Sequence, residues 1–195
     1  MSKIFINITI FIILIFNVKA EDQVHKLNQL FKELKTTNAE NSYNIEQQIW
    51  KIWSTHPTDE KKTLRLNEGA NLMSQNQLFA AIDIITEVIE LDPNWAEAWN
   101  KRATAYYLAG DYQKSQDDID KVLKLEERHF GAWAGQGLVN IQLKNYEKAM
   151  MSYKKAKEIH PTIRSPDSVI KELEKIIKEN SIYFKFVSLK YLKYK

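Results

Sequence analysis

Residues 96–127 read AEAWNKRATAYYLAGDYQKSQDDIDKVLKLEE, and the residue types of this stretch return on both sides of it at a spacing of 34 residues. Trp99 is followed by Trp133, and Tyr112 by Tyr146. Two such periods separate Pro93 from Pro161. A fixed period of this length is the signature of a helical repeat array, so the sequence predicts a row of stacked helix hairpins.

The repeated columns have a packing explanation. Helices approach closely only where side chains are small, and bulky side chains one turn further fill the remaining space. The small residues expected on first helices are Gly69, Ala103 and Gly137; those on second helices are Ala81, Ser115 and Ala149, followed four residues later by Ile85, Ile119 and Tyr153. Proline lacks an amide donor, so prolines after the second helices should end them.

These columns resemble the tetratricopeptide repeat family. In that register the three repeats are residues 62–95, 96–129 and 130–163. The sequence departs from the family pattern at Arg65 in the tryptophan column, Arg102 in the leucine column and Glu127 in the proline column. The resemblance implies an all-α fold, a right-handed superhelical stack of helix hairpins with capping helices at both ends.

Two helical segments are expected outside the repeats. Residues 21–61 have two amphipathic apolar stripes, which predict an N-terminal hairpin that caps the first repeat or, alternatively, carries a separate partner-binding helix. Residues 164–180 predict a C-terminal capping helix that begins at Ser165, Pro166 and Asp167. Residues 181–195 form a basic aromatic tail, for which an anionic membrane contact, a frayed end and an added helix are all open.

The first twenty residues have the layout of a signal peptide. Lys3 precedes an apolar run from Ile4 to Phe16, and small residues stand at Val18 and Ala20. This predicts export with cleavage after Ala20, and an uncleaved membrane anchor is the alternative. Because the chain has no cysteine, no disulfide framework supports a eukaryotic secretory route, and we expect a bacterial periplasm.

Charge and composition exclude several functions. Six lysines lie outside residues 21–181, which turns the formal charge of +3 for the chain into −3 for that segment. A mildly acidic body argues against nucleic acid as the partner. His25, His56, His129 and His160 form no two-histidine metal motif, and no phosphate loop or nucleophile elbow is present. We therefore expect no enzyme activity, catalytic residue, cofactor, metal or small-molecule substrate.

The resemblance places specific side chains on a concave face lined by the first helices. A groove with one donor-rich wall and one apolar wall favours a peptide or a partner helix, and a solvated face without a ligand is the alternative. The predicted partner-binding residues are Thr63, Asn67, Asn100, Lys101, Thr104, Tyr107, Leu138 and Gln142. Of these, Asn100, Thr104 and Tyr107 share one helix face, and we expect Ala103 and Tyr106 to pack on the opposite face.

Two further expectations concern this face. The family's clamp for C-terminal carboxylates needs lysine, asparagine and arginine at positions that hold Leu66, Ala70, Lys101, Gly131 and Gly135. Four of these five cannot donate a side-chain hydrogen bond, so that ligand class is not expected. Arg102 should pair with an acid such as Glu68, Asp117 or Asp118, because an unpaired buried guanidinium is costly.

The favoured function is thus a non-catalytic protein-interaction scaffold or adaptor. The alternative is a structural accessory of the cell envelope, held by its basic aromatic tail.

Overall fold

A computed structural model describes residues 21–164 and 166–192, and these residues form nine helices and no strand. The all-α prediction is confirmed. The predicted leader, the Ser165 cap and the last three residues lie outside the described ranges.

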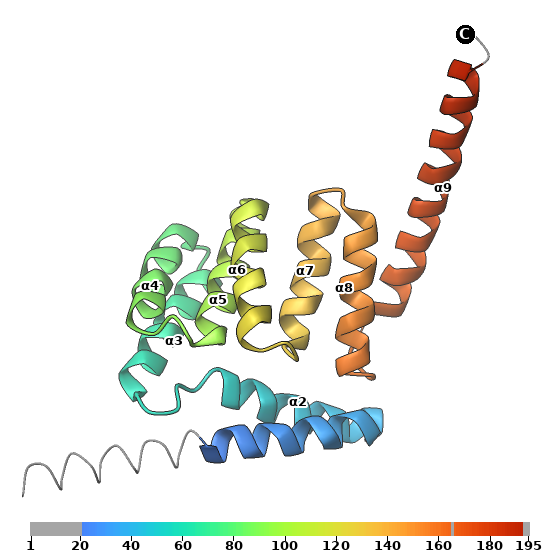
Figure 1. Cartoon of the computed structure of the whole chain (residues 1–195). Helices are drawn as coiled ribbons and strands as arrows, with labels where there is room; N and C mark the ends of the chain where they lie inside the picture. The colour runs from blue at the N-terminus through green and yellow to red at the C-terminus, as the bar shows by residue number, and fades with distance from the viewer. Residues whose placement is uncertain (1–20, 165, 193–195) are drawn as a thin grey trace, which may run out of the picture.

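Three helix hairpins stand side by side in a row (Figure 1). Their helices are α3 (Glu60–Ser74) with α4 (Leu78–Leu91), α5 (Ala96–Leu108) with α6 (Tyr112–Leu125), and α7 (Phe130–Gln142) with α8 (Tyr146–Ile159). The turns inside the hairpins repeat too: Asn76, Gly110 and Lys144, spaced by 34 residues, all adopt positive φ angles of 59°, 82° and 60°. Glycine and asparagine tolerate this conformation, whereas lysine adopts it only where the surrounding fold imposes it.

The small-residue columns pack as predicted within each hairpin. The Ser115 hydroxyl donates a 2.8 Å hydrogen bond to the carbonyl of Ala103, which joins α5 to α6. A Cβ atom added to Gly137 would lie 2.6 Å from the ring of Tyr153, and one added to Gly69 would lie 2.6 Å from Ile85. The glycines therefore make room for the bulky side chain of the paired helix.

The repeated tryptophans have a structural role. The indole N–H of Trp99 donates to the carbonyl of Pro93 at 2.9 Å, and that of Trp133 donates to the carbonyl of Glu127 at 2.8 Å. Each bond fixes the first helix of a repeat to the connection before it. Because only a backbone carbonyl is needed, Glu127 can replace the usual proline without loss of this contact.

The close contact at Gly137 gives a testable difference between two glycines of α7. Gly137→Ala should lower the free energy of unfolding by about 1–3 kcal/mol, because the new methyl group overlaps the buried ring of Tyr153. Gly135→Ala should raise it by about 0.5–1 kcal/mol, since its Cβ would meet only Ile119 at 3.8 Å and alanine favours the helix. Urea unfolding of both variants measures the difference, and equal effects would contradict the packing argument.

The N-terminal hairpin does not stack on the first repeat, and this expectation was wrong. The helix over residues 21–36 and α2 (Ala39–Trp53) lie across the lower ends of the repeat helices (Figure 1). Their buried residues share one core with Phe130 and Ile159 of the third repeat, and the N-terminal members of this core are Leu27, Leu30, Phe31, Leu34, Ile45, Ile49 and Trp53. We call this contact the seam. Most residues of both apolar stripes are buried there.

The C-terminal helix α9 (Pro166–Leu192) packs on the third repeat and then extends away from it (Figure 1). Ile170 and Leu173 are buried in one cluster with Ala149 and Tyr153, as expected of a capping helix. The helix continues without a break past Asn180, so the change in composition at the predicted tail is not a helix boundary. No helix in the described ranges is both long and apolar enough to cross a membrane.

Candidate functional site

A small pocket lies where α5, α6 and α7 meet, and we call it the α5–α7 pocket. Its volume is about 80 Å³. It is lined by Asn100, Ala103, Thr104, Tyr107, Ser115, Ile119, Gly131, Gly135, Leu138 and Val139. Four of the eight predicted binding residues, namely Asn100, Thr104, Tyr107 and Leu138, therefore share one site.

The pocket has polar and apolar walls. Leu138 is 45% exposed and supplies apolar surface to the wall. The Asn100 amide donates to Glu97 at 3.0 Å, and the Thr104 hydroxyl donates to the Asn100 carbonyl at 2.9 Å. Within the described part of the chain, the hydroxyl of Tyr107 and the side-chain oxygen of Asn100 take part in no hydrogen bond. Both remain available to a peptide backbone.

Tyr107 is more tightly packed than the sequence indicated. Its ring contacts Tyr112 at a centroid distance of 5.6 Å and lies against the core cluster that contains Ala103. Tyr106, expected in the core, instead lies under two cations, Arg102 at 5.7 Å and Lys114 at 5.4 Å. Truncating Tyr107 to alanine would therefore remove core contacts as well as pocket surface.

One lining residue of the pocket, Gly131, lies against the N-terminal hairpin. A Cβ atom added to Gly131 would lie 2.4 Å from the ring of Trp50 on α2. Gly131 is one of the carboxylate-clamp positions, so the N-terminal hairpin occupies the space that a clamp lysine would need. At Gly131 the position of α2 thus leaves no room for a larger side chain.

A buried charged network lies beneath the pocket. Lys101 places its Nζ 3.0 Å from Glu97 Oε1 and 6.0 Å from the ring centroid of Trp50, while His129 Nε2 lies 3.1 Å from Glu97 Oε2. The Glu97 Oε1 atom forms this ion pair but has no hydrogen-bond partner among the residues that the structure describes. Lys101 is therefore partly buried and paired with Glu97, and it lies outside the lining of the α5–α7 pocket.

Glu97 stays ionised despite its complete burial. Burial alone would raise the pKa of Glu97, but the hydrogen bond with His129 and the charge of Lys101 together hold that pKa below its ordinary value. The His129 ring stacks on Trp53 at 4.0 Å, and its Nδ1 accepts the amide of Ala132 at 3.0 Å. The network thus connects Asn100, which lines the α5–α7 pocket, through Glu97 and His129 to Trp53 of the seam.

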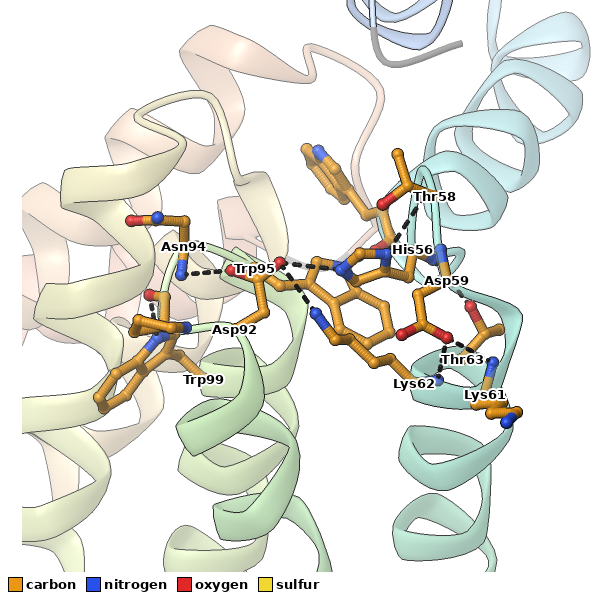
Figure 2. A network of polar contacts seen from close by, with 12 residues as sticks. His56, Thr58, Asp59, Lys61, Lys62, Thr63, Asp92, Asn94, Trp95 and Trp99 are labelled. Atoms are coloured by element: carbon orange, nitrogen blue, oxygen red, sulfur yellow. Dashed lines mark hydrogen bonds and ion pairs between the residues drawn. The ribbon is translucent and has the colours of Figure 1, made fainter. Parts of the chain in front are cut away.

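Thr63 is also engaged in a structural contact. Its hydroxyl accepts the backbone N–H of His56 at 2.9 Å. Figure 2 shows the His56 ring between the backbone of Thr58 and the carboxylate of Asp92, which His56 Nε2 contacts at 2.8 Å. Asn67 on α3 and Gln142 at the end of α7 are exposed and lie outside the lining of the α5–α7 pocket.

Arg102 pairs with one of the acids expected for it. Its Nε and one terminal nitrogen each donate to Asp118 at 2.8 Å, and the other terminal nitrogen donates to Thr86 at 3.0 Å. The guanidinium also lies 4.9 Å from the ring centroid of Trp99. The hydrogen bonds to Asp118 raise the pKa of Arg102. This residue joins three helices of the first and second repeats and does not enter the pocket.

The acidic run on α6 is divided among separate partners. Asp117 accepts from Gln113, Asp118 from Arg102, and Asp120 from Gln116 and Gln136. Over the ranges that the structure describes, no three acidic or histidine side chains converge on a point that could hold a metal ion.

Sequence reasoning missed three residues that lie beside the pocket lining: Trp50, which is close to Gly131, and Glu97 and His129, which pair with each other. The role of Trp50 depends on where the N-terminal hairpin lies, and the 34-residue period contains no information on this. The pairing of His160 with Glu46 likewise joins the third repeat to α2, whereas His56 pairs with Asp92 and His129 with Glu97.

Comparison with known proteins establishes the class. Family models described as tetratricopeptide repeat match residues 96–129 and 130–163. A TPR repeat-containing protein of Rhizobium etli is 30% identical over 149 residues, which are 76% of this chain and 72% of the relative. The chain belongs to the tetratricopeptide repeat family.

A second relative matches over a shorter segment. The heat-shock protein cognate co-chaperone sgt12 of Aspergillus fumigatus is 28% identical over 52% of this chain, and the matched segment is 30% of that protein. Solved structures agree in fold: the Sgt2 TPR domain from the same fungus has a TM-score of 0.60 at 21% identity, covering 63% of this chain and 83% of that one. The first TPR of Spaghetti (RPAP3), bound to an HSP90 peptide, has a TM-score of 0.59 at 19% identity. The match covers 61% of this chain and 94% of that one.

Proposed function

We propose that this protein is a protein-interaction adaptor that binds an extended peptide or a helix of a partner across the α5–α7 pocket. The observation that carries the proposal is the convergence of Asn100, Thr104, Tyr107 and the exposed Leu138 on one pocket. Such a site offers hydrogen-bond partners for a backbone beside an apolar contact for a side chain. Solved relatives of the same fold include TPR domains in complex with HSP90 and Hsp70 peptides.

The bound segment should differ from the peptides of those relatives in its chemistry. Gly131 and Gly135 supply no cation to a terminal carboxylate, and the single nearby lysine, Lys101, is already paired with Glu97. We therefore assign an internal peptide segment or helix with an apolar side chain directed at Leu138. A terminal carboxylate would be left without a charged partner here.

The binding proposal predicts the effect of a double substitution. Thr104→Ala with Tyr107→Leu should weaken partner binding by about 2 kcal/mol or more, because tyrosines in pockets often dominate binding energy. Leucine keeps much of the core contact that Tyr107 makes. The matched control is Lys121→Ala with Lys124→Ala, two exposed residues of α6 outside the pocket.

The measurement is calorimetric titration of each variant with a partner isolated by co-purification from the source cell. The control should bind like wild type. If the pocket variant also binds like wild type while its melting temperature is unchanged, the partner docks elsewhere.

We further propose that the adaptor acts outside the cytosol, in a bacterial periplasm. The leader-like residues 1–20 and the absence of cysteine support this. N-terminal sequencing of the protein from its own cell tests it. A chain that begins at Glu21 supports export, and an intact Met1 terminus argues against cleavage.

A further inference from the structure

A pocket much larger than the α5–α7 pocket lies at the seam and not on the predicted concave face. Its volume is about 530 Å³, within the usual range for ligand pockets. We call it the seam pocket. Its lining comes from the helix over residues 21–36, the α6–α7 connection, α7 and α8, and comprises Asn28, Phe31, Lys32, Lys35, Glu127, Arg128, Trp133, Lys155, Glu158 and Ile159.

The seam pocket has an apolar base. Phe31 and Ile159 belong to the seam core, and Trp133 is partly buried against it. The indole N–H of Trp133 is already bonded to Glu127, so its ring presents mainly apolar surface. This base suits an aromatic or aliphatic side chain.

Four cations surround this base, and two of them are already engaged. Arg128 donates to Glu126 at 2.7 Å and to Asn28 at 2.6 Å, and its guanidinium lies 4.6 Å from the ring centroid of Phe31. Lys155 is paired with Glu158 at 2.9 Å. These contacts fix the two side chains in the wall.

The other two cations are Lys32 and Lys35. They lie three residues apart on the helix over residues 21–36, so they share one face of that helix. Across the described ranges, neither lysine takes part in an ion pair or a side-chain hydrogen bond. With Glu127 and Glu158 as the acids, the lining carries a formal charge of +2, although residues 21–181 as a whole carry −3.

We propose that the seam pocket is a second binding site, for an acidic peptide segment of a partner protein that carries one aromatic or large apolar side chain. That side chain occupies the base formed by Phe31, Trp133 and Ile159, and neighbouring carboxylates pair with Lys32 and Lys35. A peptide suits this arrangement because one apolar side chain can occupy the base while carboxylates of neighbouring residues reach Lys32 and Lys35 on the adjoining helix.

The site is distinct from the α5–α7 pocket, since the two share no lining residue. One adaptor could therefore hold two segments at once. Linking two sites in this way strengthens overall binding through effective concentration.

The test uses the full chain and a fluorescein-labelled peptide with one tryptophan flanked by glutamates, followed by fluorescence polarisation. Lys32→Glu with Lys35→Glu should weaken binding by about tenfold or more, since this reverses both free charges. Lys26→Glu is the matched control, because Lys26 is exposed on the same helix outside the pocket; it should retain wild-type affinity. A peptide with glutamines in place of glutamates should bind as weakly as the double variant binds the acidic peptide.

Three outcomes would overturn the proposal. One is equal affinity of wild type and the double variant. Another is loss of acidic-peptide binding in the Thr104→Ala, Tyr107→Leu variant, which would place the peptide in the α5–α7 pocket. The third is binding of indole-3-acetate as tight as that of the peptide, which would make a small aromatic carboxylate the ligand. Trp133→Phe should keep the fold and reduce peptide affinity, which provides a readout independent of charge.

Discussion

Replacing Arg102 with methionine should lower the free energy of unfolding by about 3–5 kcal/mol, because it leaves the carboxylate of Asp118 buried without a cation. Arg102 makes two hydrogen bonds of 2.8 Å to Asp118 and one of 3.0 Å to Thr86. Solvent cannot replace these partners at a carboxylate that is only 4% exposed. The substitution therefore removes the contact that joins α4, α5 and α6.

Two controls separate charge burial from loss of packing. Arg65→Met removes ion pairs of 2.6 Å with Glu68 and Glu87 at the surface, and should cost far less stability than Arg102→Met, because ion pairs at the surface contribute little. Arg102→Met with Asp118→Leu removes both buried charges and should recover most of the lost stability. Urea unfolding gives the free energy of unfolding of all three variants. The slope of that free energy against urea concentration is compared across them. If Arg102→Met costs no more than Arg65→Met, Asp118 is not held by this pair.

Phe130→Ala should also lower the free energy of unfolding by about 3–5 kcal/mol, since Phe130 is 1% exposed at the centre of the seam. Its ring contacts Trp53 at 5.1 Å and Trp50 at 5.4 Å on α2, Phe31 at 6.5 Å on the first helix, and His160 at 5.0 Å after α8. Removing this ring opens a cavity between the N-terminal hairpin and the repeats. The hairpin should loosen before the row of repeats unfolds.

The matched control for this substitution is Phe79→Ala on α4. Phe79 is 79% exposed, so its loss should change stability by about 0.5 kcal/mol or less. Hydrogen exchange of the Phe130→Ala variant should speed up more in residues 21–53 than in α3 and α4. Uniform exchange across both regions would show that the hairpin and the repeats unfold together.

The row of repeats was predictable because its information is local and periodic. Trp99, Gly137 and Tyr153 each occupy a column whose neighbours are fixed by the hairpin itself. Arg102 is a charged residue in an otherwise apolar column, so the sequence predicts that it pairs with an acid. That the partner is Asp118 and not its neighbour Asp117 is known only from the structure. Likewise, the shared helix face of Asn100, Thr104 and Tyr107 follows from their spacing alone.

The seam was not predictable for the opposite reason. Its contacts join residues far apart in the chain, such as Trp50 with Gly131 and Glu46 with His160. Two amphipathic helices of residues 21–53 indicate that an apolar face must be buried, but not against which surface. The seam pocket and the contact of Trp50 with Gly131 both depend on that choice, so neither could be derived from residue patterns.

The uninterrupted helix α9 projects beyond the third repeat as a single element. At about 1.5 Å per residue, the stretch from Glu174, which bonds Lys154 on α8 at 3.0 Å, to Leu192 reaches roughly 27 Å. Anything attached at that end would be held at a set distance and in a set direction from the repeats. Deleting about one helical turn would bring the attached group roughly 5.4 Å closer to the repeats and leave it on the same side of the helix. Deleting half a turn would place it on the opposite side. The length of α9 would thus set both the spacing and the orientation of a group attached to its end.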